Sequence, residues 1–282
     1  MKNVVQGAGG VDLFCRDWGQ GRPVVFVASW SLPSESWSYQ MLAMNEAGYR
    51  TVAFDRRGHG RSGDPGGGYD FDTLADDLAA VLDQRDLHDA VLVGHSMGCN
   101  EIVRYLSRHG RARVAGAVLL ATMTPFVLDT ADNPDGIDAA YFENFRREQL
   151  MRDFPQWMDA NMVPFVYPDT PAGIKGWVKQ MALGASLQAL AACHRALVQT
   201  DFRAELADVD VPVLVIAGDQ DASAPLALTA RATARLLPDA RLKVYESAPH
   251  GMFITHQAEV NRDLLEFADA IAQNRATAHT EA

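Results

Sequence analysis

A Gly-X-Ser-X-Gly pentapeptide at residues 94–98, Gly-His-Ser-Met-Gly, limits the folds open to this chain more than any other feature. An apolar run over residues 90–93 precedes it, which is typical of a short buried strand, and residues 97–107 have helical periodicity. A strand that turns this sharply into a helix leaves little room for side chains two positions to either side, and the two glycines relieve that crowding. We therefore expect the turn to lift the Ser96 hydroxyl above the edge of a sheet, as a candidate nucleophile.

The composition argues against several classes of function. The 282 residues, 48% of them hydrophobic, suffice for one large α/β domain with its own core. The net charge of −11 repels phosphate backbones and anionic lipid headgroups, so we expect no nucleic-acid partner and no membrane partner. No apolar run reaches the ~18 residues of a membrane span, and the first residues lack the apolar core of a signal peptide. Three distant cysteines, Cys15, Cys99 and Cys193, argue against a disulfide framework and favour a cytoplasmic protein.

Apolar runs alternate with amphipathic segments along most of the chain, and this pattern predicts an α/β fold with a parallel sheet covered on both faces. We expect a mostly parallel, doubly wound sheet of about eight strands, at residues 4–5, 11–17, 24–28, 51–54, 90–93, 115–121, 213–217 and 242–245. Helices are expected at residues 39–47, 73–84, 97–107, 225–236 and 256–272, with Asp72 as a candidate cap of the second.

The alternation breaks over residues 122–200, where six prolines punctuate short helical segments and no strand is evident. Residues 1–121 and 201–273 would then form the core, with 122–200 a helical cap inserted after the sixth strand and 274–282 a frayed tail. The cap is rich in aromatic residues and methionines, most of which would build its own small core. Some should face Ser96, because a cap needs an apolar underside to exclude water from a reaction. Phe126, Trp157 and Met158 are the candidate substrate-binding residues here.

A serine nucleophile needs a base, and the base needs an acid that holds its tautomer. On a parallel sheet these groups should come from loops at the carboxyl ends of strands. The loop after residues 213–217 offers Asp219 and Asp221, of which Asp221 is preferred because it lies further along the loop, before Pro225. The loop after the last strand offers His250, between a proline and a glycine, where no helix explains a histidine.

The other histidines have simpler explanations. His59 would brace its own glycine-rich loop, and His95 should point away from the serine beside it. His194 follows Cys193 directly, but adjacent residues on a helix diverge, and no spacing in the chain resembles a metal site.

Hydrolysis through a serine also needs an oxyanion hole, two backbone N–H groups that face the developing negative charge. One should be the Met97 N–H, at the start of the helix after the serine. The other should come from the loop over residues 28–33.

With these residues placed, the chain resembles the α/β-hydrolase superfamily over nearly its full length, and more narrowly its cofactor-free haloperoxidase, perhydrolase and arylesterase-like branch. Four stretches carry the resemblance, at residues 54–62, 94–110, 218–225 and 248–251. The resemblance implies a triad of Ser96, Asp221 and His250, oxyanion donors on Trp30 and Met97, and no cofactor.

The chain departs from the family pattern at two positions. The family usually has His-Gly before the oxyanion residue, and this chain has Ala28-Ser29. Ser29 would shift the hole or add a hydroxyl donor, which makes it a further candidate for substrate binding. Cys99 stands where the branch usually has glycine, and we interpret it as a packing residue.

These observations predict a carboxylesterase or lactonase that forms an acyl-enzyme on Ser96, with a small-molecule ester or lactone as its partner. Perhydrolase or haloperoxidase activity is the first alternative, followed by hydrolysis of C–C, amide or lactam bonds. A ligand sensor without turnover is disfavoured because the triad is complete. The sequence leaves open whether the protein forms a homo-oligomer.

Overall fold

An eight-stranded sheet runs through the centre of the computed structural model, which describes residues 3–280. Its strand order is β1-β2-β4-β3-β5-β6-β7-β8. The first two strands pair antiparallel, β2 pairs antiparallel with β4, and the remaining neighbours are parallel. The strands are β1 (Val4–Gln6), β2 (Asp12–Trp18), β3 (Pro23–Val27), β4 (Arg50–Phe54), β5 (Ala90–His95), β6 (Val114–Leu120), β7 (Val213–Gly218) and β8 (Ala240–Tyr245). The predicted sheet of about eight mostly parallel strands is confirmed.

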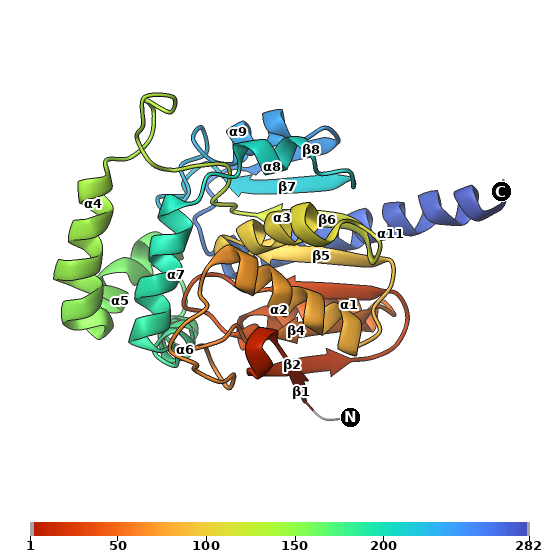
Figure 1. Ribbon diagram of the computed structural model, residues 1–282, viewed down its shortest axis with the longest axis horizontal. Helices are drawn as coiled ribbons and strands as arrows, with labels where there is room; N and C mark the ends of the chain where they lie inside the picture. Colours follow the sequence, from red (N-terminus) through yellow and green to blue (C-terminus); the bar gives the residue numbers. More distant parts are fainter. Residues whose placement is uncertain (1–2, 281–282) are drawn as a thin grey trace.

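Helices cover both faces of the sheet (Figure 1). One face carries α2 (Phe71–Gln84), α3 (Met97–His109), α8 (Arg203–Ala207) and α9 (Ala230–Leu236). The other face carries α1 (Ser38–Glu46) and α11 (Gln257–Thr280), with α10 (Met252–Thr255) just before the latter. Two short 3₁₀ helices, η1 (Ala8–Gly10) and η2 (Ser34–Trp37), lie in loops.

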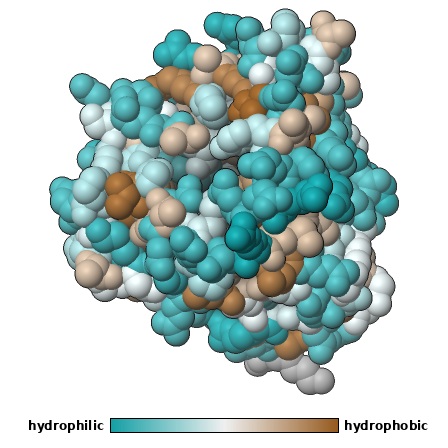
Figure 2. All heavy atoms as spheres, turned by 90° about the vertical axis from the view of Figure 1, so that its left-hand side faces the viewer, coloured by the Kyte–Doolittle hydropathy of each residue, from teal (hydrophilic) through white to brown (hydrophobic). Residues whose placement is uncertain are grey.

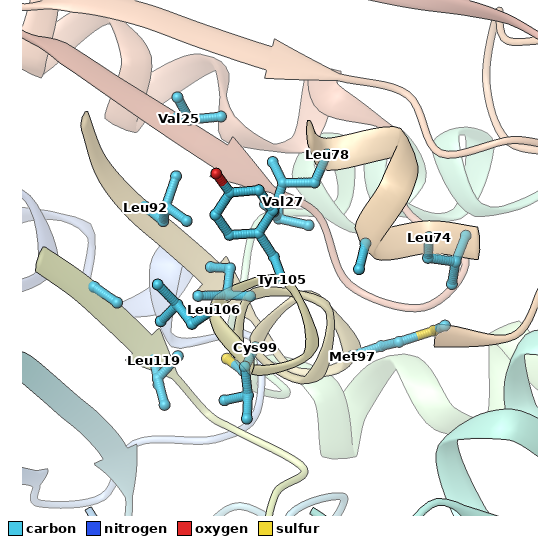
Figure 3. Packing of buried hydrophobic residues seen from close by; sticks show 14 of the residues in the cluster. Val25, Val27, Leu74, Leu78, Leu92, Met97, Cys99, Tyr105, Leu106 and Leu119 are labelled. Carbon is cyan, nitrogen blue, oxygen red and sulfur yellow. The ribbon is translucent and has the colours of Figure 1, made fainter. Parts of the chain in front are cut away.

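Strand β5 lies at the centre of the hydrophobic core, which explains why all six of its residues are buried. Leu92 packs with Val25 and Val27 of β3 and Leu119 of β6 under α2 and α3 (Figure 3). Residues 90–93 form a continuous apolar run because helices cover both sides of this strand.

The segment between β6 and β7 is helical and lies at one end of the sheet (Figure 1). It contains α4 (Ala139–Asn144), the π-helix η3 (Phe145–Leu150), α5 (Met151–Phe165), α6 (Ala172–Ala182) and α7 (Leu187–Gln199). We call residues 122–200 the cap. Figure 2 views the molecule from the cap side, where hydrophilic residues cover most of the face and hydrophobic ones form separate patches.

No single helix within residues 3–280 has the length and apolar character needed to cross a membrane. Only α6 and α7 taken together pass that test, and a bend of 92° separates them.

Several element boundaries differ from the sequence-based expectations by one residue or more. Helix α2 begins earlier than expected, and Asp70 rather than Asp72 caps it, accepting a hydrogen bond from the Thr73 N–H. Helix α9 begins at Ala230 rather than at residue 225, because residues 226–229 form a turn. Helix α11 extends to Thr280, beyond the expected end at residue 272, in a stretch without glycine or proline. The frayed tail over residues 274–282 stays a prediction. Residues 281–282 of that predicted tail lie outside the described residues.

Candidate active site

Ser96 lies in a strained turn between β5 and α3. Its backbone has φ 54° and ψ −119°, a conformation that is uncommon for a residue with a side chain. A Cβ atom on Gly94 would lie 2.8 Å from the Cys99 nitrogen, and one on Gly98 would lie 2.3 Å from the Val27 carbonyl oxygen. The structure therefore confirms that both glycines of the pentapeptide are required by close approach of the backbone.

His250 and Asp221 form a buried pair. The His250 Nδ1 lies 2.7 Å from Asp221 Oδ2, and the two side chains are 6% and 1% exposed. The other carboxylate oxygen of Asp221 accepts hydrogen bonds from the N–H groups of Ser223 and Ala224. These contacts hold the carboxylate in place and fix the proton of a neutral His250 on Nδ1, which leaves Nε2 as the basic atom. Asp219, the competing acid, is exposed.

The loop that carries His250 is also held from two other directions. His95 Nε2 donates to the His250 carbonyl oxygen over 2.9 Å, and the ring centres of the two histidines are 4.8 Å apart. The Gly251 N–H donates to the Phe165 carbonyl oxygen of the cap over 2.7 Å. The expectation that His95 points away from the site is wrong, because its ring packs against that of His250.

The contact between His95 and His250 brings the neighbouring Ser96 and the loop that carries His250 to the same end of the sheet. Ser96 and His250 are each only 4% exposed. No hydrogen bond joins the Ser96 hydroxyl and the His250 ring within the described part of the chain. Such bonds are often long without substrate and tighten when it binds.

The loop after β3 carries the second expected oxyanion donor. Within residues 3–280, neither the Trp30 N–H nor the Met97 N–H donates a hydrogen bond, so neither donor is already used inside the protein. Ser31 follows Trp30 with φ 68°, so the chain turns sharply at this point. The Met97 side chain packs in the same core cluster as Leu74 of α2 (Figure 3).

The indole of Trp30 joins this loop to the cap. Its Nε1 donates to the Leu190 carbonyl oxygen of α7 over 2.9 Å. Four cap rings lie edge-on to it, with ring centres 5.7–6.1 Å away: Phe145, Phe154, Trp157 and His194. The cap thus presents an apolar aromatic surface beside the expected oxyanion donor.

The four candidate substrate-binding residues are placed differently. Trp157 packs against Trp30, and Met158 is buried in the same core cluster as the cap helices. Ser29 is buried, and its carbonyl oxygen accepts a hydrogen bond from Arg56. Phe126 lies under the Arg203 guanidinium, 5.4 Å from it, and no ring contact joins it to the Trp30 cluster within the described residues.

Burial sets the charge of the site histidines. It lowers the pKa of His95 well below the ordinary value, and the neighbouring His250 adds to the effect. Burial likewise lowers the pKa of His194 to about 3, with Arg146 nearby as a second cause. Both side chains are therefore neutral at pH 7 and serve as hydrogen-bonding and packing groups.

Two buried charged residues were missed by the sequence analysis. Arg56 donates from Nε to Glu101 Oε1 over 2.6 Å, and both side chains are at most 2% exposed. Burial raises the pKa of Glu101 to about 7, and Arg56 opposes that rise. The signal available in the sequence was Glu101 itself, a charged residue on the helix that follows a buried turn.

Neither a metal site nor a reactive thiol accompanies these groups in the described region. No cluster of three or more His, Cys, Asp or Glu side chains within residues 3–280 could hold a metal ion. Cys99 is fully buried, and burial raises the pKa of its thiol. Its Sγ contacts the Leu120 carbonyl oxygen, as a packing residue would.

Comparison with known proteins agrees with this architecture. The family model described as the alpha/beta hydrolase fold matches residues 22–257. A non-heme chloroperoxidase, CPO-A1, of Kitasatospora aureofaciens is 41% identical over 265 residues, which cover 92% of this chain and 96% of the relative. A bifunctional esterase/perhydrolase of Acinetobacter calcoaceticus is 36% identical over 270 residues, 92% of this chain and 96% of its own.

A solved structure matches closely as well. The esterase from Exiguobacterium antarcticum superposes with a TM-score of 0.91 at 27% identity, covering 95% of this chain and all of its own. The chain belongs to the α/β-hydrolase superfamily and, within it, to the branch of the non-heme haloperoxidases.

Proposed function

We propose that this protein is a serine hydrolase that cleaves carboxylic esters or lactones through an acyl-enzyme on Ser96. The observation that carries the proposal is the buried contact of His250 Nδ1 with Asp221 Oδ2, 2.7 Å long, beside a serine in a strained strand-to-helix turn. The small-molecule substrate would bind between the cap and the carboxyl ends of the strands.

In the first half of the reaction, the Ser96 hydroxyl oxygen attacks the substrate carbonyl, and its proton passes to His250 Nε2. Asp221 remains ionised and stabilises the resulting imidazolium through its contact with Nδ1. The Trp30 and Met97 N–H groups receive the carbonyl oxygen as it becomes negative, an interaction typically worth about 3–4 kcal/mol per donor in the transition state. The C–O bond then breaks, and His250 returns the proton to the leaving alcohol.

In the second half, His250 takes a proton from water, whose oxygen attacks the acyl group on Ser96. The bond between Ser96 and the acyl group then breaks, His250 returns the proton to the Ser96 oxygen, and the acid leaves. The cap excludes bulk water from these steps, and its aromatic surface around Trp30 favours an apolar or aromatic group in the substrate.

The test is Ser96→Ala, assayed with a 4-nitrophenyl ester and with a fluorophosphonate that labels activated serines. The variant should fold, lose the label, and retain at most roughly 10³–10⁴ over the uncatalysed rate. A variant that keeps most of the wild-type rate would show that Ser96 is not the nucleophile.

Perhydrolysis is a second candidate, because the relatives include a bifunctional esterase/perhydrolase and a non-heme chloroperoxidase. In that reaction hydrogen peroxide replaces water in the second half and leaves with the acyl group as a peracid. Acetate, longer esters and lactones, each assayed with and without peroxide, separate the two activities. Peracid formation that depends on Ser96 supports perhydrolysis, and hydrolysis unaffected by peroxide supports the esterase.

A further inference from the structure

Arg56 binds two consecutive carbonyl groups of the loop that ends at Trp30. Its Nη1 donates to the Ser29 carbonyl oxygen over 3.0 Å, and its Nη2 donates to the Ala28 carbonyl oxygen over 2.6 Å. The guanidinium comes from the loop after β4, and its side chain is only 2% exposed. A planar guanidinium carries its donors on three nitrogens in a fixed fork, so it can hold both carbonyls and the Glu101 carboxylate at once, whereas an ammonium group presents all of its donors from a single nitrogen.

This contact fixes the direction of the Trp30 N–H. The Ser29 carbonyl and the Trp30 N–H belong to one planar trans peptide unit, in which the two bonds point to opposite sides. Because Arg56 holds the carbonyl on its own side, the N–H must face away from Arg56. That N–H donates no hydrogen bond to any described residue, so it is available to a substrate oxygen.

Glu101 connects Arg56 to the other half of the expected oxyanion hole. It lies on α3, four residues after Met97, and accepts from Arg56 Nε over 2.6 Å, with Nη2 also in contact. The Glu101 side chain is 1% exposed, and its second oxygen, Oε2, has no hydrogen-bond partner in the described structure. The Arg56–Glu101 pair therefore ties the helix that starts at Met97 to the loop that carries Trp30.

Packing alone gives no reason for a charged pair at this place. Two buried charges lose their hydration, and apolar residues of similar volume are often as stable or more so. The hydrogen bonds from the guanidinium to the two carbonyls give Arg56 a directional role, and this role explains why a charged residue is buried here.

We infer that Arg56, held by Glu101, is a positioning residue that orients the Ser29–Trp30 peptide and so sets the oxyanion hole. The inference rests on the proposed function, because it assigns how that site stabilises the oxyanion. Arg56 does not touch the substrate, and it acts only through the backbone of residues 28–30.

The test compares Arg56→Lys with Arg57→Lys. Arg57 is the matched control, because it forms an equally buried pair with Asp77 and binds the Ala8 carbonyl oxygen, but does not contact the Trp30 loop. Each variant is assayed for kcat and KM on a 4-nitrophenyl ester, after titration of active sites with a fluorophosphonate. Each is also assayed for inhibition by a trifluoromethyl ketone, whose adduct with the serine carries an oxyanion.

Arg56→Lys should lower kcat per active site by 10-fold or more, up to the roughly 10²–10³ that loss of one donor costs. KM should change by less than about 3-fold, and affinity for the trifluoromethyl ketone should fall in parallel with kcat. The pH dependence of kcat/KM should keep its wild-type midpoint, since the His250–Asp221 pair is untouched. Arg57→Lys should keep wild-type kcat and inhibitor affinity per active site, even where it lowers stability.

Glu101 supplies the conservative comparison. Glu101→Gln keeps an oxygen that can accept from Arg56 Nε, so it should retain most of the kcat that Glu101→Leu loses. Equal losses of kcat for Arg56→Lys and Arg57→Lys, or an unchanged inhibitor affinity in Arg56→Lys, would overturn the inference. These outcomes differ from a failure of the proposed function, in which the wild-type protein itself would neither hydrolyse the ester nor take the label on Ser96.

Discussion

The His95 side chain donates its Nε2–H to the carbonyl oxygen of His250 over 2.9 Å, so the residue next to Ser96 holds the backbone of the proposed base. The His95 ring is also enclosed by Trp37, Phe253 and Phe165, with ring centres 4.8–6.5 Å away. Its Nδ1 is buried and has no hydrogen-bond partner among the described residues, which agrees with a neutral ring whose proton is on Nε2.

Replacing His95 should therefore reduce activity through the position of His250. His95→Phe leaves the His250 carbonyl without its donor, which costs about 1–3 kcal/mol of stability. It should also lower kcat by about 10-fold or more, since small displacements of a catalytic group are costly. His95→Gln keeps an N–H donor of similar reach and should retain most of the activity. Kinetics on a 4-nitrophenyl ester, with urea unfolding of each variant, measures both effects, and equal kcat for the two variants would contradict this role.

Asp221→Asn should inactivate the enzyme without changing its shape. The Asp221 Oδ1 accepts from two backbone N–H groups, so an asparagine would place its carbonyl oxygen there and turn its NH₂ group toward His250. His250 Nδ1 would then have to accept a hydrogen bond, and Nε2 would carry the proton and lose its basicity. We expect kcat to fall by roughly 10⁴, as the loss of the correct tautomer does in other serine hydrolases.

The matched control for that variant is Asp219→Asn, two residues away and exposed. It should retain wild-type kcat and KM. A comparable loss of kcat in both variants would mean that activity depends on the conformation of the loop rather than on the carboxylate of Asp221.

The sequence predicted the sheet and the pentapeptide turn because both depend on local patterns. The apolar run of β5 and the glycines at 94 and 98 identify a buried strand and a crowded turn from neighbours alone. The candidate acid Asp221 could be chosen because its loop follows a strand, and the structure pairs it with His250 across 29 positions of the chain.

The features that sequence reasoning missed depend on contacts between distant segments. Arg56 meets Glu101 across 45 positions, and Trp30 meets Leu190 across 160 positions, so no window of the sequence contains either pair. The orientation of His95 depends on a strained turn at Ser96 that periodicity does not describe. Even the local cap of α2 was assigned to Asp72 instead of Asp70, since both acids precede the same apolar pattern.

Acid should destabilise the protein through His59, a fully buried histidine whose Nδ1 contacts the Arg57 carbonyl oxygen. Burial, with the Arg56 charge as a second cause, lowers the pKa of His59 to about 3. Below pH 6.5 the unfolded chain takes up a proton here that the folded protein does not. The contribution of the neutral His59 to the free energy of unfolding is therefore complete above pH 6.5, and it is lost as the pH falls toward 3.

The slope should approach about 1.4 kcal/mol per pH unit well below pH 6.5, which gives a loss of about 1.6 kcal/mol between pH 6.5 and pH 5. His59→Asn keeps an N–H donor for the Arg57 carbonyl but does not titrate. Urea unfolding at pH 5, 6 and 7 should thus show a shallower pH dependence for His59→Asn than for the wild-type protein. Identical slopes for the two proteins would mean that His59 takes up its proton in the folded state.

Gly98→Ala tests how closely α3 approaches the end of β3. The new Cβ would lie 2.3 Å from the Val27 carbonyl oxygen and 2.9 Å from that of Ala28, so the helix start must shift away. We expect a destabilisation of about 1–3 kcal/mol, typical of overpacking. The kcat should also fall, because the same shift moves the Met97 N–H.

The control is Gly176→Ala on α6, where nothing lies within 4 Å of the added Cβ. This change should stabilise the protein by about 0.5–1 kcal/mol, as alanine does inside a helix, and leave kcat unchanged. Thermal unfolding measures the stability of both variants, and ester kinetics measures their kcat. An unaltered kcat in Gly98→Ala would contradict the expectation that the start of α3 positions an oxyanion donor.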